Sequence, residues 1–250
     1  MKKSLYKIKG KNEYIFNIFR KNKKILKKMD SQKPVRSDLK IIIIGTSGTG
    51  KTSFVNKWTK KIFCENYKPT IVSEFGFKIV EIKGNSYRVQ LWDIGGQDTS
   101  GSMTKIFAKD SHGCIILCEV GKIDTLDDTK KWKKSVDDSA TFVDGGPIPC
   151  LLIQNKIDLI TDNEEREQIK LKTKLFCDEN NFANSFVSSV KEDINIDESM
   201  AFLVELIIDR LEAYAAKGND VFNNPNNRET IKLQEEKHKR SSVAEKKCCK

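Results

Sequence analysis

A single stretch, residues 45–52, restricts the possible folds of this chain more than any other feature. It reads Gly-Thr-Ser-Gly-Thr-Gly-Lys-Thr and matches the phosphate-loop pattern Gly-x4-Gly-Lys-Ser/Thr at every fixed position. An apolar run, 39–44, precedes it and a candidate helix, 53–62, follows, which is the strand–loop–helix context that the pattern requires. The alternative is a glycine-rich turn that matches by chance.

The chemistry expected of this loop is the binding of a nucleotide's phosphates together with Mg²⁺. Glycines let main-chain N–H groups approach phosphate oxygens, and the start of the following helix adds a positive partial charge. We expect Lys51 to reach the β- and γ-phosphates and to assist catalysis, and the Thr52 hydroxyl to ligate Mg²⁺. The other predicted nucleotide contacts of the loop are Gly45, Ser47, Gly48, Thr49, Gly50 and Ser53.

A second motif, Asn155-Lys-Ile-Asp158, predicts which base is bound. The Asp158 carboxylate can accept hydrogen bonds from N1–H and the exocyclic N2–H₂ of guanine, whereas adenine offers neither donor there and would leave a buried carboxylate unpaired. The Lys156 stem can cover the base face, and Asn155 can tie loops together. A polar exit from a strand is the alternative interpretation. The predicted cofactors are GTP or GDP, with Mg²⁺.

Three residues between these motifs are candidates for sensing the γ-phosphate. Asp93 provides a carboxylate for the Mg²⁺ shell through water, Gly96 provides a main-chain N–H, and Gln97 is placed to orient an attacking water. Thr70 is a further candidate for Mg²⁺ and the γ-phosphate. A single Thr or Gln in a loop is weak by itself, but the serial order of these residues makes each support the others.

Two further segments are candidate base contacts. Phe63 could stack on the guanine edge, with core packing at a helix end as the alternative. The segment Ser189-Val190-Lys191 could offer a main-chain N–H to guanine O6.

The remaining pattern predicts an α/β fold of the three-layer P-loop type. It is a mostly parallel six-stranded sheet with one antiparallel edge strand and helices on both faces. The expected strands are 39–44, 75–83, 87–92, 113–119, 148–154 and 185–188. The expected helices are 53–62, 124–138, 163–179 and 196–216, the second opened by Asp124 as an acidic cap. Ligands of such sheets lie at the carboxyl ends of the strands, where all these motifs fall.

Charge is distributed unevenly along the 250 residues and divides the chain into three parts. The net charge is +10, with +11 in residues 1–37, −5 in 38–216 and +4 in 217–250. We therefore expect a basic N-terminal extension over 1–37, a nucleotide-binding domain over 38–216 and a disordered tether over 217–250. Apolar residues of the extension could form one face of a helix that lies on an anionic membrane, with a disordered basic tail or a helix packed on the domain as the alternatives.

Cysteine spacing and hydropathy exclude several classes of protein. The seven cysteines form no Cys-x-x-Cys pair and accompany no histidine cluster, so a zinc site is not expected. Their odd number, without a secretory signal, indicates a reducing compartment. No apolar run reaches 18 residues, so no membrane span is predicted.

Together these motifs resemble the Ras superfamily of small GTPases over about residues 38–216. The segments that carry the resemblance are Tyr67-Lys-Pro-Thr70, Trp92-Asp-Ile-Gly-Gly-Gln97 and Asn155-Lys-Ile-Asp158. Paired cysteines near the end, Cys248 and Cys249, are similar to those of the Rab branch. The resemblance implies GTP/GDP cycling, a nucleotide contact for Tyr67, and prenylation of both cysteines. It also implies exchange factors, GTPase-activating proteins and effectors that bind loops 64–73 and 94–107.

Within that branch, several phrases resemble the subgroup that serves melanosomes and other lysosome-related organelles. They are Leu-Trp-Asp-Ile at 91–94, Pro-Ile-Pro at 147–149 with the Leu-Leu-Ile-Gln-Asn-Lys-Ile-Asp run behind it, and the segment 191–205. The implied location is the cytoplasmic face of an endosomal, lysosome-related or Golgi-derived membrane, with a cytosolic pool. Anchoring would use the C-terminal lipid and the basic arms.

Departures from the family pattern leave alternatives open. Gly95, Val72, Thr99-Ser100 and Val190 replace the usual residues, and Lys250 follows the paired cysteines. Gly95 is typical of the Arf branch, but Lys2 stands where Arf-type myristoylation needs glycine. The main alternative is a GTP-bound membrane scaffold with little hydrolysis. A nucleic-acid-associated GTPase is less favoured, because the basic extension contains few arginines, and no nucleic-acid partner is expected.

Overall fold

The computed structural model describes residues 36–65, 73–96, 102–219 and 221. The chain divides into two units, Met1–Arg210 and Leu211–Lys250. Within the described part, the first contains the whole sheet, and the second contains the last turns of a helix and a turn in which Asn219 Nδ2 donates to the Tyr214 carbonyl at 3.1 Å. No helix among the described residues is long and apolar enough to cross a bilayer.

The first unit is built around a six-stranded sheet, as predicted. Its strands are β1 (Ser37–Ile44), β2 (Ser73–Ile82), β3 (Asn85–Ile94), β4 (Gly113–Glu119), β5 (Cys150–Asn155) and β6 (Asn184–Ser188). They follow the order β2-β3-β1-β4-β5-β6. Only the β2–β3 pair is antiparallel, so the predicted antiparallel edge strand is confirmed. The apolar runs of β1, β4 and β5 are buried because these strands lie inside the sheet with both faces covered.

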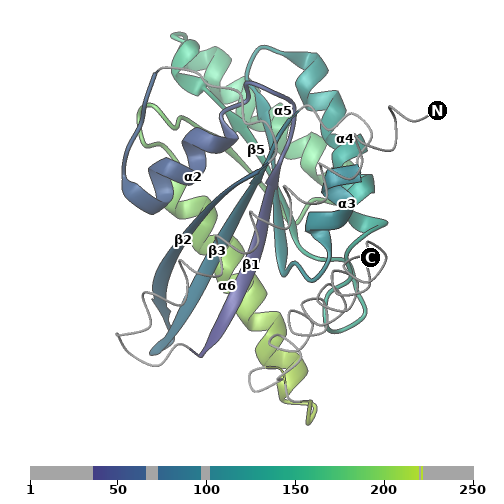
Figure 1. The fold of residues 1–250 in the computed structure, drawn as a ribbon. Coiled ribbons are helices and arrows are strands. Elements are labelled where there is room, and N and C mark those ends of the chain that lie inside the picture. Colours follow the sequence, from purple (N-terminus) through teal and green to yellow (C-terminus); the bar gives the residue numbers. More distant parts are fainter. Residues whose placement is uncertain (1–35, 66–72, 97–101, 220, 222–250) are drawn as a thin grey trace, which may run out of the picture. The chain divides into compact units, whose positions relative to one another are not determined.

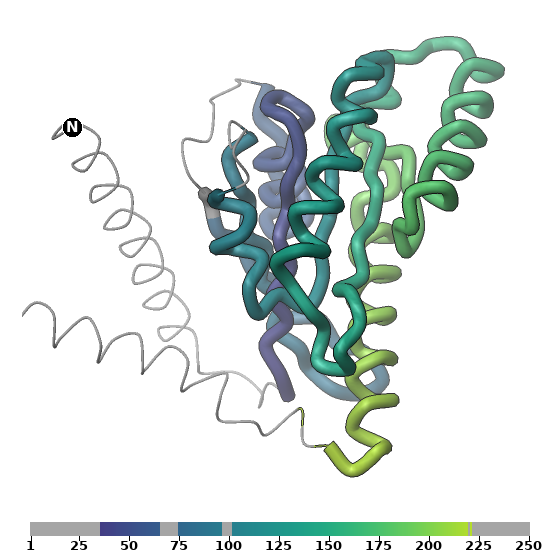
Figure 2. Tube along the Cα trace, turned by 90° about the vertical axis from the view of Figure 1, so that its right-hand side faces the viewer, coloured from purple at the N-terminus to yellow at the C-terminus, as the bar shows by residue number. Residues whose placement is uncertain are grey.

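Helices cover both faces of this sheet. They are α2 (Lys51–Lys60), α3 (Ser102–Ala108), α4 (Ile123–Asp137), α5 (Asn163–Glu179) and α6 (Ile196–Ala215), with a short 3₁₀ helix, η1 (Ile157–Leu159). Right-handed crossovers place α2 on the face opposite α3, α4 and α5, since the chain moves in opposite directions along the sheet. Figure 1 shows α2 and α4 on opposite sides of the strands, and Figure 2 shows α4 in front of them.

The first part of α6 packs on the same face as α2. A Cβ on Gly113 of β4 would lie 2.8 Å from Ile207 Cδ1, so α6 lies against the centre of the sheet. Ion pairs join Lys61, just after α2, to Asp197, and Lys83, in the β2–β3 turn, to Asp209 at 2.7 Å. This packing leaves the carboxyl ends of the parallel strands free to hold the predicted motifs.

The predicted bounds of two helices differ from the structure. The helix after the phosphate loop begins at Lys51 and ends at Lys60, where Lys61 takes a left-handed conformation. Asp124 does not cap α4: the helix starts one residue earlier, and Asp124 lies in its first turn. There the Thr125 hydroxyl donates to the Lys122 carbonyl at 2.8 Å and accepts from the Glu119 N–H at 2.9 Å.

The segment 94–107, interpreted as a loop, contains most of α3. Phe107 and Ala108 are buried and Phe107 lies 5.9 Å from the Trp92 ring, whereas Ile106 is exposed. The seven-residue helix was missed because so short an apolar pattern gives little periodicity, and its stability comes from packing on β3 and β1.

Candidate functional site

The phosphate loop runs from Gly45 to Gly50 between β1 and α2. Gly50 has φ 99° and directly precedes α2, and a Cβ there would lie 2.5 Å from Asn155 Nδ2. The Thr49 hydroxyl donates to the Thr46 carbonyl at 2.9 Å, which closes the loop on itself. Only glycine at 50 satisfies both the left-handed backbone and the close approach of Asn155.

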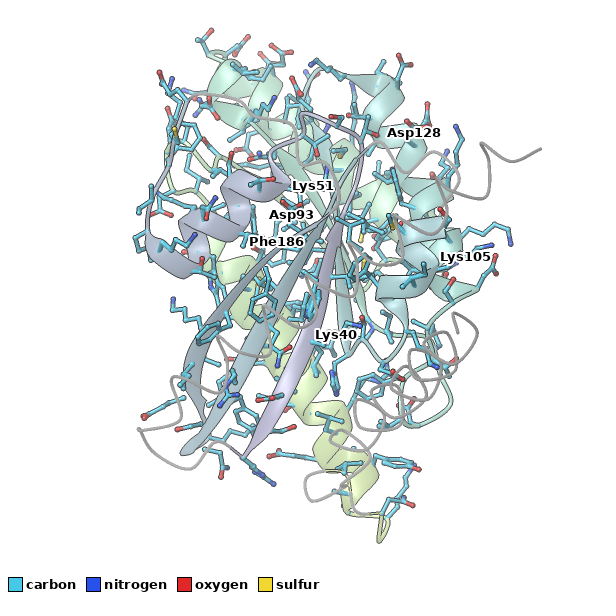
Figure 3. All side chains as sticks on the ribbon, in the orientation of Figure 1. Lys40, Lys51, Asp93, Lys105, Asp128 and Phe186 are labelled. Carbon is cyan, nitrogen blue, oxygen red and sulfur yellow. The ribbon has the colours of Figure 1, made fainter. Side chains whose placement is uncertain are left out.

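The Lys51 side chain is buried inside this loop. Its ammonium donates to the carbonyl oxygens of Gly45 at 2.8 Å and Thr46 at 3.0 Å. Burial lowers the pKa of Lys51, and the nearby Asp93 carboxylate partly offsets this effect. Figure 3 shows Lys51 and Asp93 close together. A buried cation within a ring of main chain at a helix start suits a polyphosphate.

Two hard oxygen donors lie beside Lys51. Asp93, in β3, is fully buried, and one of its carboxylate oxygens accepts a hydrogen bond from the Thr52 hydroxyl. Among the described residues, no group of three or more His, Cys, Asp or Glu side chains could hold a metal. Mg²⁺ is commonly held by one or two protein oxygens together with substrate phosphates, so this donor set fits Mg²⁺.

Gly96 brings the end of β3 against the phosphate loop. A Cβ at this position would lie 2.5 Å from the Ser47 N–H nitrogen and 2.7 Å from both the Gly45 carbonyl oxygen and Lys51 Nζ. No side chain fits there, so the main chain itself lies next to the lysine. Contact between the Gly96 N–H and a γ-phosphate stays a prediction.

Asn155 connects the phosphate loop to the two segments predicted to select the base, 155–158 and 188–191. Its Nδ2 donates to the Thr49 carbonyl at 2.9 Å, and its Oδ1 accepts from the Ser188 hydroxyl at 3.1 Å and the Val190 N–H at 3.2 Å. The N–H of Val190, one of the main-chain donors in the segment predicted to contact guanine O6, therefore bonds to Asn155 in this structure. The buried amide holds three segments from distant parts of the chain in one place.

Asp158 follows Asn155 on η1 and is half-buried. Its Oδ1 accepts from the Ser189 hydroxyl at 2.5 Å, and the Ser189 oxygen in turn accepts from the Glu192 N–H at 3.0 Å. Ile157, next to it, packs with Val120 and Val187 in a small apolar cluster. The carboxylate is thus oriented by a hydroxyl while its neighbour anchors the turn.

Only some of the remaining predicted site residues lie in the described part of the chain. Phe63 is half-buried just after α2, and Lys191 reaches Glu65 at 3.6 Å, so this segment lies beside the base-selecting loop. Ser53 lies in the first turn of α2, and Ser47 and Gly48 lie in the phosphate loop. Tyr67, Thr70, Gln97, Cys248 and Cys249 fall outside the described residues. The five described cysteines are free thiols, four of them buried.

Two residues of the site were not found from the sequence. Glu119, at the end of β4, forms ion pairs with Lys156 at 2.8 Å and Lys122 at 2.9 Å. Asp128, on α4, accepts a hydrogen bond from the Thr46 hydroxyl of the phosphate loop at 3.3 Å. A carboxylate at the carboxyl end of a buried parallel strand was a usable signal for Glu119. No comparable sequence signal pointed to Asp128, because it is one of many charged residues on its helix.

Comparison with known proteins finds the Ras family and Ras-related proteins throughout. The sequence model of the Ras family matches residues 40–209. The chain is 33% identical over 196 residues to the human Ras-related protein Rab-32, covering 78% of this chain and 86% of that protein. It is 36% identical over 167 residues to the rat Ras-related protein Rab-7L1, covering 66% and 80%. It is also 36% identical over 171 residues to Rab-32A of Dictyostelium discoideum, covering 68% and 77%.

Proposed function

This chain belongs to the Ras family, as a Rab-type small GTPase near the Rab-32 subgroup, and from this premise we propose a GTP/GDP-regulated switch of membrane traffic. The observation that carries the proposal is the Asn155 side chain. Its three hydrogen bonds join the phosphate loop around Lys51 to the segments of Asp158 and Ser189. One ligand with a polyphosphate at one end and a guanine at the other fits this arrangement.

Each residue of the site has a specific role in this proposal. Lys51 binds the β- and γ-phosphates, Thr52 and Asp93 hold Mg²⁺, and Asp158 accepts the two guanine N–H donors. When bound, Mg²⁺ neutralises charge that develops on the phosphates. Gln97 orients the attacking water, and Thr70 and Tyr67 complete the nucleotide contacts. The buried position of Lys51 excludes water from the ammonium and strengthens its attraction for phosphate.

The two loops expected to respond to the γ-phosphate lead into one aromatic cluster. Phe75 of β2 lies 5.1 Å from the Trp92 ring of β3, which lies 5.9 Å from the Phe107 ring of α3. Phe75 follows the loop 64–73, and Phe107 belongs to 94–107. Ordering of either loop would therefore act on the same cluster. Trp92 and Phe107 are buried in it, so regulators and effectors are proposed to bind the two loops themselves.

Hydrolysis is proposed to be slow without a partner. Neither loop 64–73 nor 94–107 contains an arginine in its sequence. Unaided small GTPases turn over on the order of 10⁻⁴ per second, and an arginine supplied by a partner accelerates this about 10³- to 10⁵-fold. The proposed site of action is the cytoplasmic face of an intracellular membrane, with Cys248 and Cys249 as lipid acceptors supported by the basic arms.

The decisive experiment measures nucleotide binding on purified full chain in Mg²⁺ buffer, and single-turnover hydrolysis with and without an added GTPase-activating protein. We expect GTP and GDP to bind and ATP not to bind. Gln97→Leu should slow partner-stimulated hydrolysis at least tenfold while sparing GTP binding, because only water orientation is lost. Gln168→Leu, an exposed change on α5, is the matched control. Equal uptake of ATP would refute the proposal, and binding without partner-stimulated hydrolysis would favour a scaffold.

A further inference from the structure

Glu119 is a buried carboxylate that none of the roles described above uses. It is the last residue of β4, it pairs in register with Asn155 of β5, and its side chain is 7% exposed. Its position at the carboxyl end of a central parallel strand places it beside the base-selecting motif. A buried acid is costly unless it is paired, so its partners indicate why it is there.

Glu119 pairs with two lysines that differ in exposure and in their place in the site. Oε2 accepts from Lys156 Nζ at 2.8 Å, and Oε1 pairs with Lys122 Nζ at 2.9 Å. Burial acts to raise the pKa of Glu119, but the hydrogen bonds from Lys156 and Lys122 outweigh it, so the net pKa is lowered. Glu119 is therefore an anion at neutral pH. Lys122 is 61% exposed, whereas Lys156 is 31% exposed and belongs to the base-selecting motif.

The backbone of Lys156 makes this contact more than a surface ion pair. Lys156 has φ 73°, a left-handed conformation that side chains other than glycine rarely adopt, and the Leu159 N–H donates to its carbonyl at 3.0 Å. Ion pairing to Glu119 at the end of β4 then fixes the far end of the side chain. Both ends of a flexible four-carbon stem are held, and its freedom to rotate is lost before any ligand arrives.

We propose that Glu119 is a positioning residue for guanine recognition, which fixes the Lys156 stem in the place where it covers the base. The inference rests on the proposed function, because the base contact of Lys156 belongs to it. Glu119 itself does not touch the nucleotide; it acts through Lys156. A pre-positioned lysine does not have to be ordered on binding, so the effect is on nucleotide retention.

The structure also offers an internal control. Lys122 contacts the same carboxylate but is not part of the base-selecting motif and is mostly exposed. If Glu119 only neutralises charge at the end of β4, removing either lysine has the same consequence. If it acts through Lys156, only that lysine matters for the nucleotide.

The experiment measures release of a fluorescent GDP analogue from full chain in Mg²⁺ buffer with excess unlabelled GDP. We expect Glu119→Gln to release it about tenfold faster, as for loss of one charge-assisted hydrogen bond. Lys122→Met should stay within about twofold of wild type, the size of a weak exposed ion pair. Glu119→Asp, which keeps the charge but shortens the side chain, should be about threefold faster, an intermediate loss, and tests the proposal by itself if Glu119→Gln does not fold.

A double-mutant cycle separates positioning from a merely structural role. In the Lys156→Met background, Glu119→Gln should add no further acceleration, because its target is absent. Equal acceleration in both backgrounds would overturn the proposal, as would wild-type release rates in both Glu119 variants. Wild-type chain that binds no guanine nucleotide would instead refute the proposed function, so the two failures are distinguishable.

Discussion

The Asn155 side chain donates a hydrogen bond to the Thr49 carbonyl at 2.9 Å, across 106 positions of the sequence. The same side chain accepts from Ser188 and Val190, so one buried amide joins the phosphate loop to both segments that are proposed to select the base. The position of the phosphate loop therefore depends on the position of the two segments proposed to bind the base. Loosening this amide should affect both ends of the nucleotide.

The first prediction concerns Asn155→Ala. It removes three hydrogen bonds and leaves buried partners unsatisfied, so we expect GDP release to accelerate about 10- to 100-fold. Stopped-flow release of a fluorescent GDP analogue measures this directly. Asn163→Ala, at the exposed start of α5, is the matched control and should behave as wild type. A wild-type release rate for Asn155→Ala would contradict the coupling.

The second prediction concerns the close approach at Gly96. Gly96→Ala places a methyl 2.7 Å from Lys51 Nζ and 2.5 Å from the Ser47 nitrogen, so the chain must move away from the phosphate loop. We expect GTP affinity to fall at least tenfold relative to GDP, because the lost approach serves the γ-phosphate. Calorimetric titration with both nucleotides measures the ratio. Gly84→Asn, in the open β2–β3 turn where φ is 76°, should leave the ratio unchanged.

The third prediction concerns base selection by Asp158. Asp158→Asn replaces one acceptor oxygen with a donor amide, which opposes a guanine N–H but suits the carbonyl of xanthine. GDP affinity should fall by about two orders of magnitude or more while xanthosine diphosphate gains affinity. Competition binding with both nucleotides tests this, with Asp178→Asn on α5 as control. Parallel loss of both nucleotides would show that Asp158 supports the fold and does not select the base.

A fourth prediction concerns His112, away from the nucleotide site. Its main-chain N–H donates to the Lys40 carbonyl at 2.7 Å, and its Nδ1 accepts from the Lys40 N–H at 3.0 Å. Burial, and then the charge of Lys40, lower the pKa of His112 to about 4, although Asp110 opposes the shift. His112 is therefore neutral in the folded protein at pH 7.

Because the unfolded chain binds this proton near pH 6.5, folding stability should decrease as pH falls from 6.5 to 4, by up to about 3 kcal/mol. Well above pH 6.5 the residue should make no contribution to the pH dependence of the free energy of unfolding, because it is neutral in both the folded and the unfolded chain. His112→Asn keeps a hydrogen-bond acceptor but does not titrate, so urea unfolding at pH 7.0, 5.5 and 4.5 should show a shallower loss. His238→Asn removes the other histidine as a control. Identical pH dependence of wild type and His112→Asn would exclude this role.

Sequence patterns located most of the fold because its signals are local. The apolar runs of β1, β4 and β5 and the amphipathic pattern of α6 each indicate their structure within a few residues. The start of α4 was misjudged because Thr125, not Asp124, makes the hydrogen bonds that fix it. The helix α3 was missed because its stability comes from packing of Phe107 against Trp92.

By itself the sequence determined which functional groups the site contains: a glycine-rich loop with a lysine, and two acids for which we propose roles at the metal and at the base. Their spacing and types carry that information because each acts through one functional group. Only the tertiary structure decided how these groups are held, since Asn155 reaches Thr49, and Glu119 reaches Lys156, only when β1, β4 and β5 lie side by side. Contacts between segments far apart in the chain depend on the packed sheet, and no local pattern specifies them.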